Sequence, residues 1–159
     1  MRLYRVFDHA YRASAMSGEG AASTGGRWNS KGVRVVYASE TLALALLEIM
    51  ANARRTIPPG KVFLTIDLPD QFKIELLHEE ALPPRWTTAP APRRLQELGD
   101  EWVREARTVA LMVPSAIVPI ERNVLLNPAH PDFGRLVIGT PRRIPVDQLL
   151  RSKRTRKPR

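Results

Sequence analysis

Apolar and polar residues alternate along several short stretches of the chain, and this period of two predicts β-strands with one buried face. The alternation is clearest at residues 3–7 and 61–68. Residues 33–37 form a short apolar run rich in β-branched side chains, which is typical of a buried strand. Weaker signals of the same kinds predict four further strands, at residues 72–77, 109–113, 124–126 and 136–138.

One longer segment, residues 41–53, predicts an α-helix that is apolar almost all round. Ser39 is placed to cap its N-terminus. Because such a helix is expected to be largely buried, its narrow polar stripe must face either a cleft or a strip of solvent. Three residues form that stripe: Thr41, Glu48 and Asn52.

A second helix is predicted over residues 93–105, where an apolar stripe recurs at helical spacing and Gly99 weakens the helix. Residues 146–150 predict a last helical turn. Three segments predict connections: a long Gly/Ser/Ala-rich loop at 14–31, a Pro-rich surface loop carrying Trp86 at 83–92, and a rigid turn at 127–131. Strands outnumber helices and seldom alternate with them, which predicts one mixed α+β domain, residues 1–150, rather than a doubly wound sheet.

The composition is that of an ordinary globular domain. The chain has 159 residues, of which 43% are hydrophobic, and no apolar run approaches the roughly 18 residues that span a bilayer. There is no secretory signal pattern at the N-terminus and no cysteine, so we expect a cytoplasmic protein without disulfides. The three histidines, His9, His78 and His130, lack metal-ligand spacing, and we expect no metal.

The positive charge is concentrated at the C-terminus. Six of the last nine residues, 151–159, are Lys or Arg, and subtracting them from the formal net charge of +9 leaves +3 on the rest of the chain. Such a tail is typically disordered and solvated. It also offers an electrostatic handle for nucleic acid or an acidic partner protein.

Arg27 is a candidate anion-binding residue because it follows two glycines, Gly25 and Gly26. Glycine lets a backbone approach a ligand closely, and the planar guanidinium matches phosphate oxygens. The alternative is a surface arginine after a turn, followed by Trp28 as a core residue.

Glu48 is the most informative acid. In a cleft, its carboxylate could stabilise positive charge on a ribose carbon as the bond to a leaving group breaks. The alternative is a solvated side chain on the helix edge. No second carboxylate is paired with it in the sequence pattern, which disfavours two-carboxylate hydrolysis.

Four further residues are candidates for substrate binding, each with a structural alternative. Tyr37 ends a predicted strand, and its ring could stack on a base or nicotinamide or simply fill the core. Ser115 follows Pro114 and could bind a ribose or phosphate, or belong to a turn; it has no nucleophile-elbow motif. Asn29 and Asn123 are candidate polar positioning residues or turn residues.

In these residues the chain resembles the RES domain family, which is named for an Arg, a Glu and a Ser. The resemblance covers about residues 3–140 and consists of short pieces in a fixed order. They are Leu3-Tyr4-Arg5, Gly20-Ala21, Gly25-Gly26-Arg27-Trp28-Asn29, residues 35–39, Ala45-Leu46-Leu47-Glu48, Val113-Pro114-Ser115 and residues 123–133. Each piece is weak alone, and their order makes the match specific.

The resemblance implies the toxin of a bacterial toxin–antitoxin pair, with an ADP-ribosyltransferase-like split sheet and flanking helices. It implies that NAD⁺ is a substrate rather than a cofactor, and that Arg27 and Glu48 are catalytic. By the same resemblance Arg27, Tyr37, Glu48 and Ser115 would line the NAD⁺ site, and we expect Asn29 and Asn123 to bind NAD⁺ beside them.

The implied partner is an Xre-like helix-turn-helix antitoxin that blocks the pocket, so that DNA is contacted only through the antitoxin and no membrane is involved. A homodimer within that complex stays open. Two rival functions also stay open: transfer of ADP-ribose to a protein, and nucleic-acid binding through the basic tail.

Overall fold

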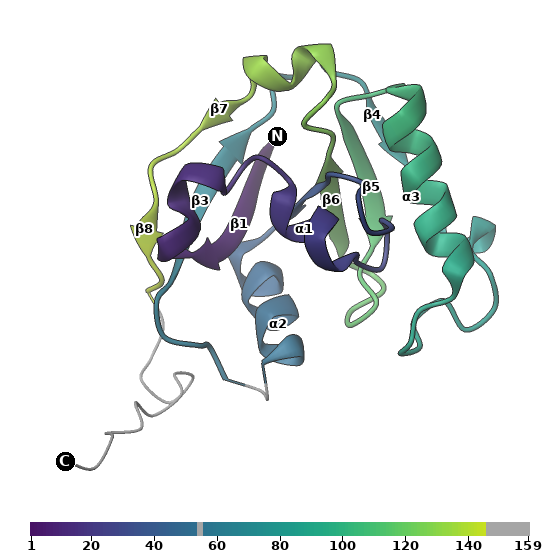
Figure 1. The fold of residues 1–159 in the computed structure, drawn as a ribbon, viewed down its shortest axis with the longest axis horizontal. Helices are drawn as coiled ribbons and strands as arrows, with labels where there is room; N and C mark the ends of the chain where they lie inside the picture. Colours follow the sequence, from purple (N-terminus) through teal and green to yellow (C-terminus); the bar gives the residue numbers. More distant parts are fainter. Residues whose placement is uncertain (54–55, 146–159) are drawn as a thin grey trace.

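The computed structural model describes residues 1–53 and 56–145 (Figure 1). Its strands are β1 Arg2–Asp8, β2 Val36–Ser39, β3 Lys61–Asp67, β4 Ile74–Leu76, β5 Ala110–Pro114, β6 Arg122–Leu126, β7 Val137–Ile138 and β8 Arg142–Arg143. Its α-helices are α1 Glu19–Thr24, α2 Leu42–Asn52 and α3 Arg93–Glu105, and its 3₁₀ helices are η1 His9–Ser14, η2 Glu79–Ala81 and η3 Pro131–Arg135. None of the helices in the described ranges has the length and apolar character to cross a bilayer.

The strands form one mixed sheet in the order β4-β5-β6-β2-β1-β3-β7, with β8 also paired to β3. Every pairing is antiparallel except that of β4 with β5. β1 and β2 share a single registered pair, Tyr4 with Ser39, whereas β1 pairs with β3 over seven residues. The sheet therefore divides between β1 and β2 into two halves, as the split-sheet prediction requires.

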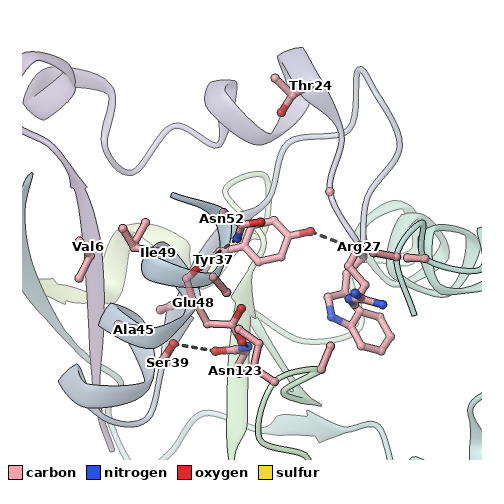
Figure 2. Close-up of a pocket in the computed structure, with 18 of the residues that line it drawn as sticks. Val6, Thr24, Arg27, Tyr37, Ser39, Ala45, Glu48, Ile49, Asn52 and Asn123 are labelled. Carbon is pink, nitrogen blue, oxygen red and sulfur yellow. Dashed lines mark hydrogen bonds between the residues drawn. The ribbon is translucent and has the colours of Figure 1, made fainter. Parts of the chain in front are cut away.

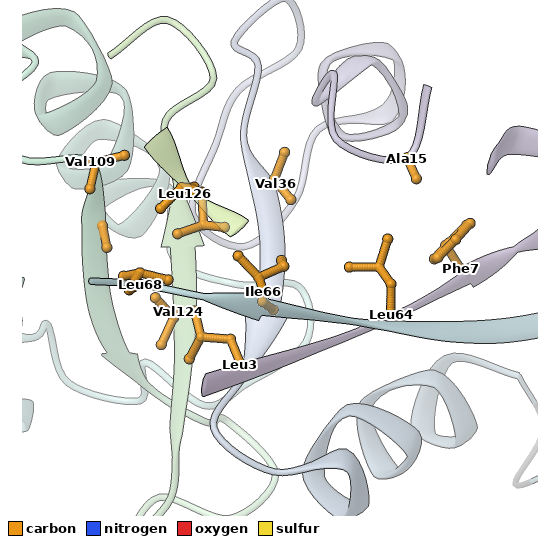
Figure 3. Packing of buried hydrophobic residues seen from close by; sticks show 13 residues of the cluster. Leu3, Phe7, Ala15, Val36, Leu64, Ile66, Leu68, Val109, Val124 and Leu126 are labelled. Carbon is orange, nitrogen blue, oxygen red and sulfur yellow. The ribbon is translucent and has the colours of Figure 1, made fainter. Parts of the chain in front are cut away.

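Alternation along the strands gives the sheet two apolar faces. On one face, side chains from both halves form a shared core, which includes Leu3, Val36, Ile66 and Val124 (Figure 3). On the other face the apolar residues fall into two separate clusters. One lies under α2 with Val6 and Phe63, and the other lies under α3 with Trp28, Trp86, Trp102 and Leu125. The second face is therefore covered at its two ends and open between them.

Helix α3 runs over the predicted range, residues 93–105. The packing of this helix explains why a glycine stands at position 99. A Cβ added at Gly99 would lie 1.8 Å from the carbonyl oxygen of Trp28. The glycine thus allows the helix to touch the backbone of the 25–29 turn. Trp86 lies in a loop as predicted, but it is 5% exposed, because its ring packs in the cluster under α3.

Several local predictions were wrong. Thr41, and not Ser39, caps α2, because its side chain accepts a hydrogen bond from the Leu44 backbone N–H. The predicted loop at 14–31 contains the short helix α1, and the strand predicted at 33–37 begins only at Val36. The two-residue strand β8 gave no sequence signal.

Helix α2 is also less buried than its composition predicted. Only Leu44, Ala45 and Leu46 are buried, and Leu47 is 38% exposed. The helical turn predicted at 146–150 and the basic tail at 151–159 lie outside the described residues.

Candidate functional site

A cavity of about 950 Å³ fills the open centre of the second sheet face (Figure 2). Its floor is made by the strands at the split, its first wall by α2, and its second wall by the 24–28 turn and the Pro-rich loop. Lining residues from these parts include Tyr4, Val6, Tyr37, Ser39 and Asn123 of the strands, Ala45, Glu48, Ile49 and Asn52 of α2, and Arg27, Thr87 and Pro90 opposite. The predicted polar stripe of α2 thus faces a cleft, through Glu48 and Asn52.

The carboxylate of Glu48 is held through one of its two oxygens. Oε1 accepts hydrogen bonds from Ser115 Oγ at 2.9 Å and from Asn123 Nδ2 at 2.6 Å. Among the described residues no hydrogen bond to Oε2 is formed. The arrangement fixes the carboxylate on the cavity wall and leaves one anionic oxygen for a ligand.

Ser115 is a positioning residue by its contacts. Its hydroxyl oxygen accepts hydrogen bonds from the backbone N–H groups of Ile117 and Val118, each at 3.1 Å. Since these donors occupy the oxygen's acceptor positions, the hydroxyl proton is directed to Glu48. Ser115 is fully buried and does not line the cavity, so it reaches a ligand only through Glu48.

Helix α3 holds the turn that carries Arg27. Gln96 Nε2 donates to the Gly26 carbonyl at 2.9 Å, and Asp100 Oδ1 accepts from the Ser30 backbone N–H at 2.9 Å. Gly99 packs against the Trp28 carbonyl between these two contacts. The turn is therefore fixed to α3 at three successive points.

The Arg27 guanidinium lies across the cavity from Glu48, with the Tyr37 ring between them (Figure 2). Its Nη1 donates to the Trp86 and Thr88 carbonyls, at 2.5 and 3.2 Å, and so ties the Pro-rich loop to the turn. Burial lowers the pKa of Arg27, and the negative charge of Glu48 partly offsets that effect. The two groups therefore act on one another electrostatically within one cavity.

The Tyr37 ring is locked by its hydroxyl group. The hydroxyl donates to Asn29 Oδ1 at 2.7 Å and accepts from the Trp28 backbone N–H at 3.2 Å. Asn29 is fully buried and donates in turn to the Ala21 and Val33 carbonyls, at 3.0 Å each. Burial raises the pKa of the Tyr37 phenol, so the group stays neutral near pH 7.

Arg5 is a cavity residue that the sequence analysis did not single out. Nε donates to the Ala15 carbonyl at 2.8 Å, and Nη1 donates across the split to the Tyr37 carbonyl at 2.7 Å. Within the described residues it has no carboxylate partner, and burial lowers its pKa to about 10, so it stays a cation at neutral pH. A sequence signal existed: Arg5 occupies the position between Leu3 and Phe7 on the buried face of its strand.

The structure thus brings together the cavity-lining residues Arg27, Tyr37, Glu48 and Asn123. Asn29 and Ser115 were predicted to contact substrate directly, and both lie behind the cavity wall with no exposed surface. Their contacts position Tyr37 and Glu48 instead. Within residues 1–53 and 56–145, no three His, Asp, Glu or Cys side chains are grouped as metal ligands.

Comparison with solved structures identifies the class of fold. A chain from the crystal structure of the M. tuberculosis MbcT–MbcA toxin–antitoxin complex matches with a TM-score of 0.73 at 20% sequence identity, over 90% of this chain and 83% of that one. This chain, with its split sheet and central cleft, therefore has the same α+β fold as the matched chain of that complex.

Sequence comparison gives the family. The chain belongs to the RES domain family, whose model matches residues 2–147. It is 42% identical over 125 residues to the Prs ADP-ribosylating toxin of Sphingobium sp. (strain YBL2), covering 77% of this chain and 78% of the relative. It is 38% identical over 135 residues to Toxin Res of Yersinia enterocolitica serotype O:8, covering 84% and 88%. The chain is a RES-family toxin, as the sequence resemblance predicted.

Proposed function

We propose that this toxin consumes NAD⁺ by cleaving the bond between nicotinamide and ribose. The observation that carries the proposal is the cavity in which Arg27 and Glu48 lie on opposite sides of Tyr37. A dinucleotide with a pyrophosphate, two riboses and a positively charged nicotinamide needs cationic donors at one end and an anion at the other. This cavity has both.

Each cavity residue has a proposed role. Arg27 is a cation available to the pyrophosphate, since no carboxylate among the described residues forms a hydrogen bond with it. The Tyr37 ring offers a flat, locked surface for nicotinamide. Asn123 orients Glu48 and borders the same space.

Glu48 is the proposed catalytic residue. As the glycosidic bond breaks, positive charge develops on the ribose, and the free Oε2 lies on the cavity wall to stabilise it. Nicotinamide leaves as a neutral molecule, so the reaction needs no general acid. A single held carboxylate therefore suffices for the chemistry.

Water, phosphate or a protein nucleophile can each accept the ADP-ribosyl group. We propose glycohydrolysis or phosphorolysis as the main reaction. ADP-ribosyl transfer to a protein is the second candidate, and it is favoured by the relative named as a Prs ADP-ribosylating toxin.

We also propose that a helix-turn-helix antitoxin of the Xre type covers this cavity and contacts DNA on behalf of the pair. The support is that the matched MbcT structure is itself a toxin–antitoxin complex. From the family resemblance we further propose that the toxin is cytoplasmic and that it forms a homodimer within the complex with its antitoxin.

The test is the conversion of NAD⁺ by the purified toxin freed of its partner, with free nicotinamide as product. Glu48→Ala should lower kcat at least about 10²-fold, since it removes the charge that acts in the transition state, and Arg27→Ala should lower kcat/KM at least about 10²-fold, since it removes the cation that binds the pyrophosphate. The controls are Arg93→Ala and Glu80→Ala, which remove the same two charges at exposed positions. Both control variants should convert NAD⁺ as fast as the parent protein.

Two outcomes would decide against parts of the proposal. Full activity in both site variants, with folding intact, would remove the assigned mechanism. Label from NAD⁺ that stays on a protein band, without bulk loss of NAD⁺, would replace hydrolysis or phosphorolysis by transfer.

A further inference from the structure

Ser39 occupies the point at which the two halves of the sheet meet. Its antiparallel partner on β1 is Tyr4, and its partner on β6 is Asn123, which in turn faces Val113 on β5. These paired residues form a row across the sheet, and the row crosses the split directly beneath Glu48. Ser39 is 3% exposed, although it contributes to the cavity floor.

The hydroxyl of Ser39 donates to Asn123 Oδ1 at 2.6 Å (Figure 2). The other side of the same amide donates from Nδ2 to Glu48 Oε1, also at 2.6 Å. Glu48 Oε1 accepts from the NH₂ side of the amide, and this leaves Oδ1 facing Ser39. The three side chains form a directional chain from serine to amide to carboxylate.

Asn123 has a competing arrangement if Ser39 does not hold it. The amide is only half-buried and borders the cavity, so a rotation of its side chain would expose Oδ1 to cavity water. That rotation would also withdraw Nδ2 from Glu48. A carboxylate held by Ser115 alone could then turn about its remaining hydrogen bond.

We propose that Ser39 is a positioning residue for the reaction, acting through Asn123 to orient Glu48 Oε2 toward the ribose. The inference rests on the proposed NAD⁺-consuming function. It gives Ser39 a role in place of the helix cap that its sequence position suggested, which Thr41 supplies.

A double-mutant cycle on the full chain tests this role. Ser39→Ala should lower kcat for NAD⁺ about tenfold with little change in KM, because one hydrogen bond in the chain is lost. In an Asn123→Ala background the same change should cost almost nothing, since the residue through which Ser39 acts is gone. Ser39→Thr, which keeps the hydroxyl, should recover most of the activity. Ser23→Ala, at an exposed hydroxyl that donates only to the Gly20 carbonyl, is the matched control.

The side-chain amide signals of Asn123 in ¹⁵N-labelled protein give a readout that needs no activity. They should shift or broaden in Ser39→Ala and stay in place in Ser23→Ala. Unmoved Asn123 signals, or equal losses from Ser39→Ala in both backgrounds, would overturn the role. If the parent protein converts no NAD⁺ at all, the proposed function has failed, and the amide signals still report whether Ser39 holds Asn123.

Discussion

At the scale of single residues, the site separates groups that face the cavity from groups that hold them. Glu48 and Tyr37 line the cavity, and each is fixed from behind by a fully buried polar residue, Ser115 or Asn29. A buried polar group is costly unless its hydrogen bonds are complete. The same contacts that orient the site therefore also stabilise the fold.

Tyr37→Phe tests this coupling. The change leaves Asn29 Oδ1 without its donor in a fully buried place, and it removes the acceptor of the Trp28 N–H. We expect the free energy of unfolding to fall by about 1–3 kcal/mol in urea titrations. Tyr11→Phe is the matched control, since Tyr11 is 68% exposed, and it should change stability by less than about 0.5 kcal/mol.

Comparison of the parent protein with Tyr37→Phe also tests how the free energy of unfolding changes with pH. The folded protein raises the pKa of Tyr37, so its phenol favours the native state below the unfolded pKa of about 10. That contribution is lost as the pH rises further, and the parent should lose stability there more steeply than Tyr37→Phe. Equal alkaline slopes and equal midpoints would contradict the role given to the hydroxyl.

At the scale of elements, α3 determines where Arg27 lies although it carries no predicted site residue. The helix contacts the 26–30 segment through Gln96, Gly99 and Asp100. Gly99 lowers helix propensity, and its missing side chain is what lets the helix approach the Trp28 carbonyl. Local preference thus yields to tertiary packing at this position.

Gly99→Ala should therefore destabilise the protein although alanine is the better helix former. A Cβ at 1.8 Å from a backbone oxygen forces α3 and the turn apart. We expect a loss of about 1–3 kcal/mol in the free energy of unfolding, and a larger KM for NAD⁺ as Arg27 moves. Denaturant unfolding and NAD⁺ kinetics measure the two effects.

Gly20→Ala is the control for helix propensity. Gly20 lies in α1, and an added Cβ there meets nothing within 4 Å. It should leave the protein equally stable or more stable by about 0.5–1 kcal/mol. If both alanine variants behaved alike, the close approach of α3 to the turn would not matter.

At the scale of the molecule, the divided sheet creates the cavity. The two halves share a core on one face, whereas on the other face α2 and α3 cover separate clusters and leave the split open between them. Arg5 borders the cavity and bridges the split, because its Nη1 donates a hydrogen bond to the Tyr37 carbonyl. The residues that give the cavity its charge, Arg27 and Glu48, are thus different from the six basic residues at positions 151–159.

Deleting residues 151–159 tests that separation. NAD⁺ conversion should be unchanged, because every residue assigned to the site lies before residue 124. Any affinity of the toxin for DNA or RNA should fall, together with its salt dependence, since six cations are removed. If the shortened chain still binds nucleic acid, with an affinity that added NAD⁺ does not change, that result would support the alternative function, a nucleic-acid-binding module.

The sequence by itself determined the strands whose alternation is strict, the helix α3, the α+β class and the residues of the RES pattern. These depend on local periodicity or on the order of short motifs, which a sequence carries directly. Only the tertiary structure decided that Arg5 lines the cavity, that Asn29 and Ser115 stand behind it, and that Ser39 bonds Asn123 rather than a helix end. Those outcomes depend on the register between strands and on contacts between residues as far apart as Ser39 and Asn123, and no local pattern records such distances.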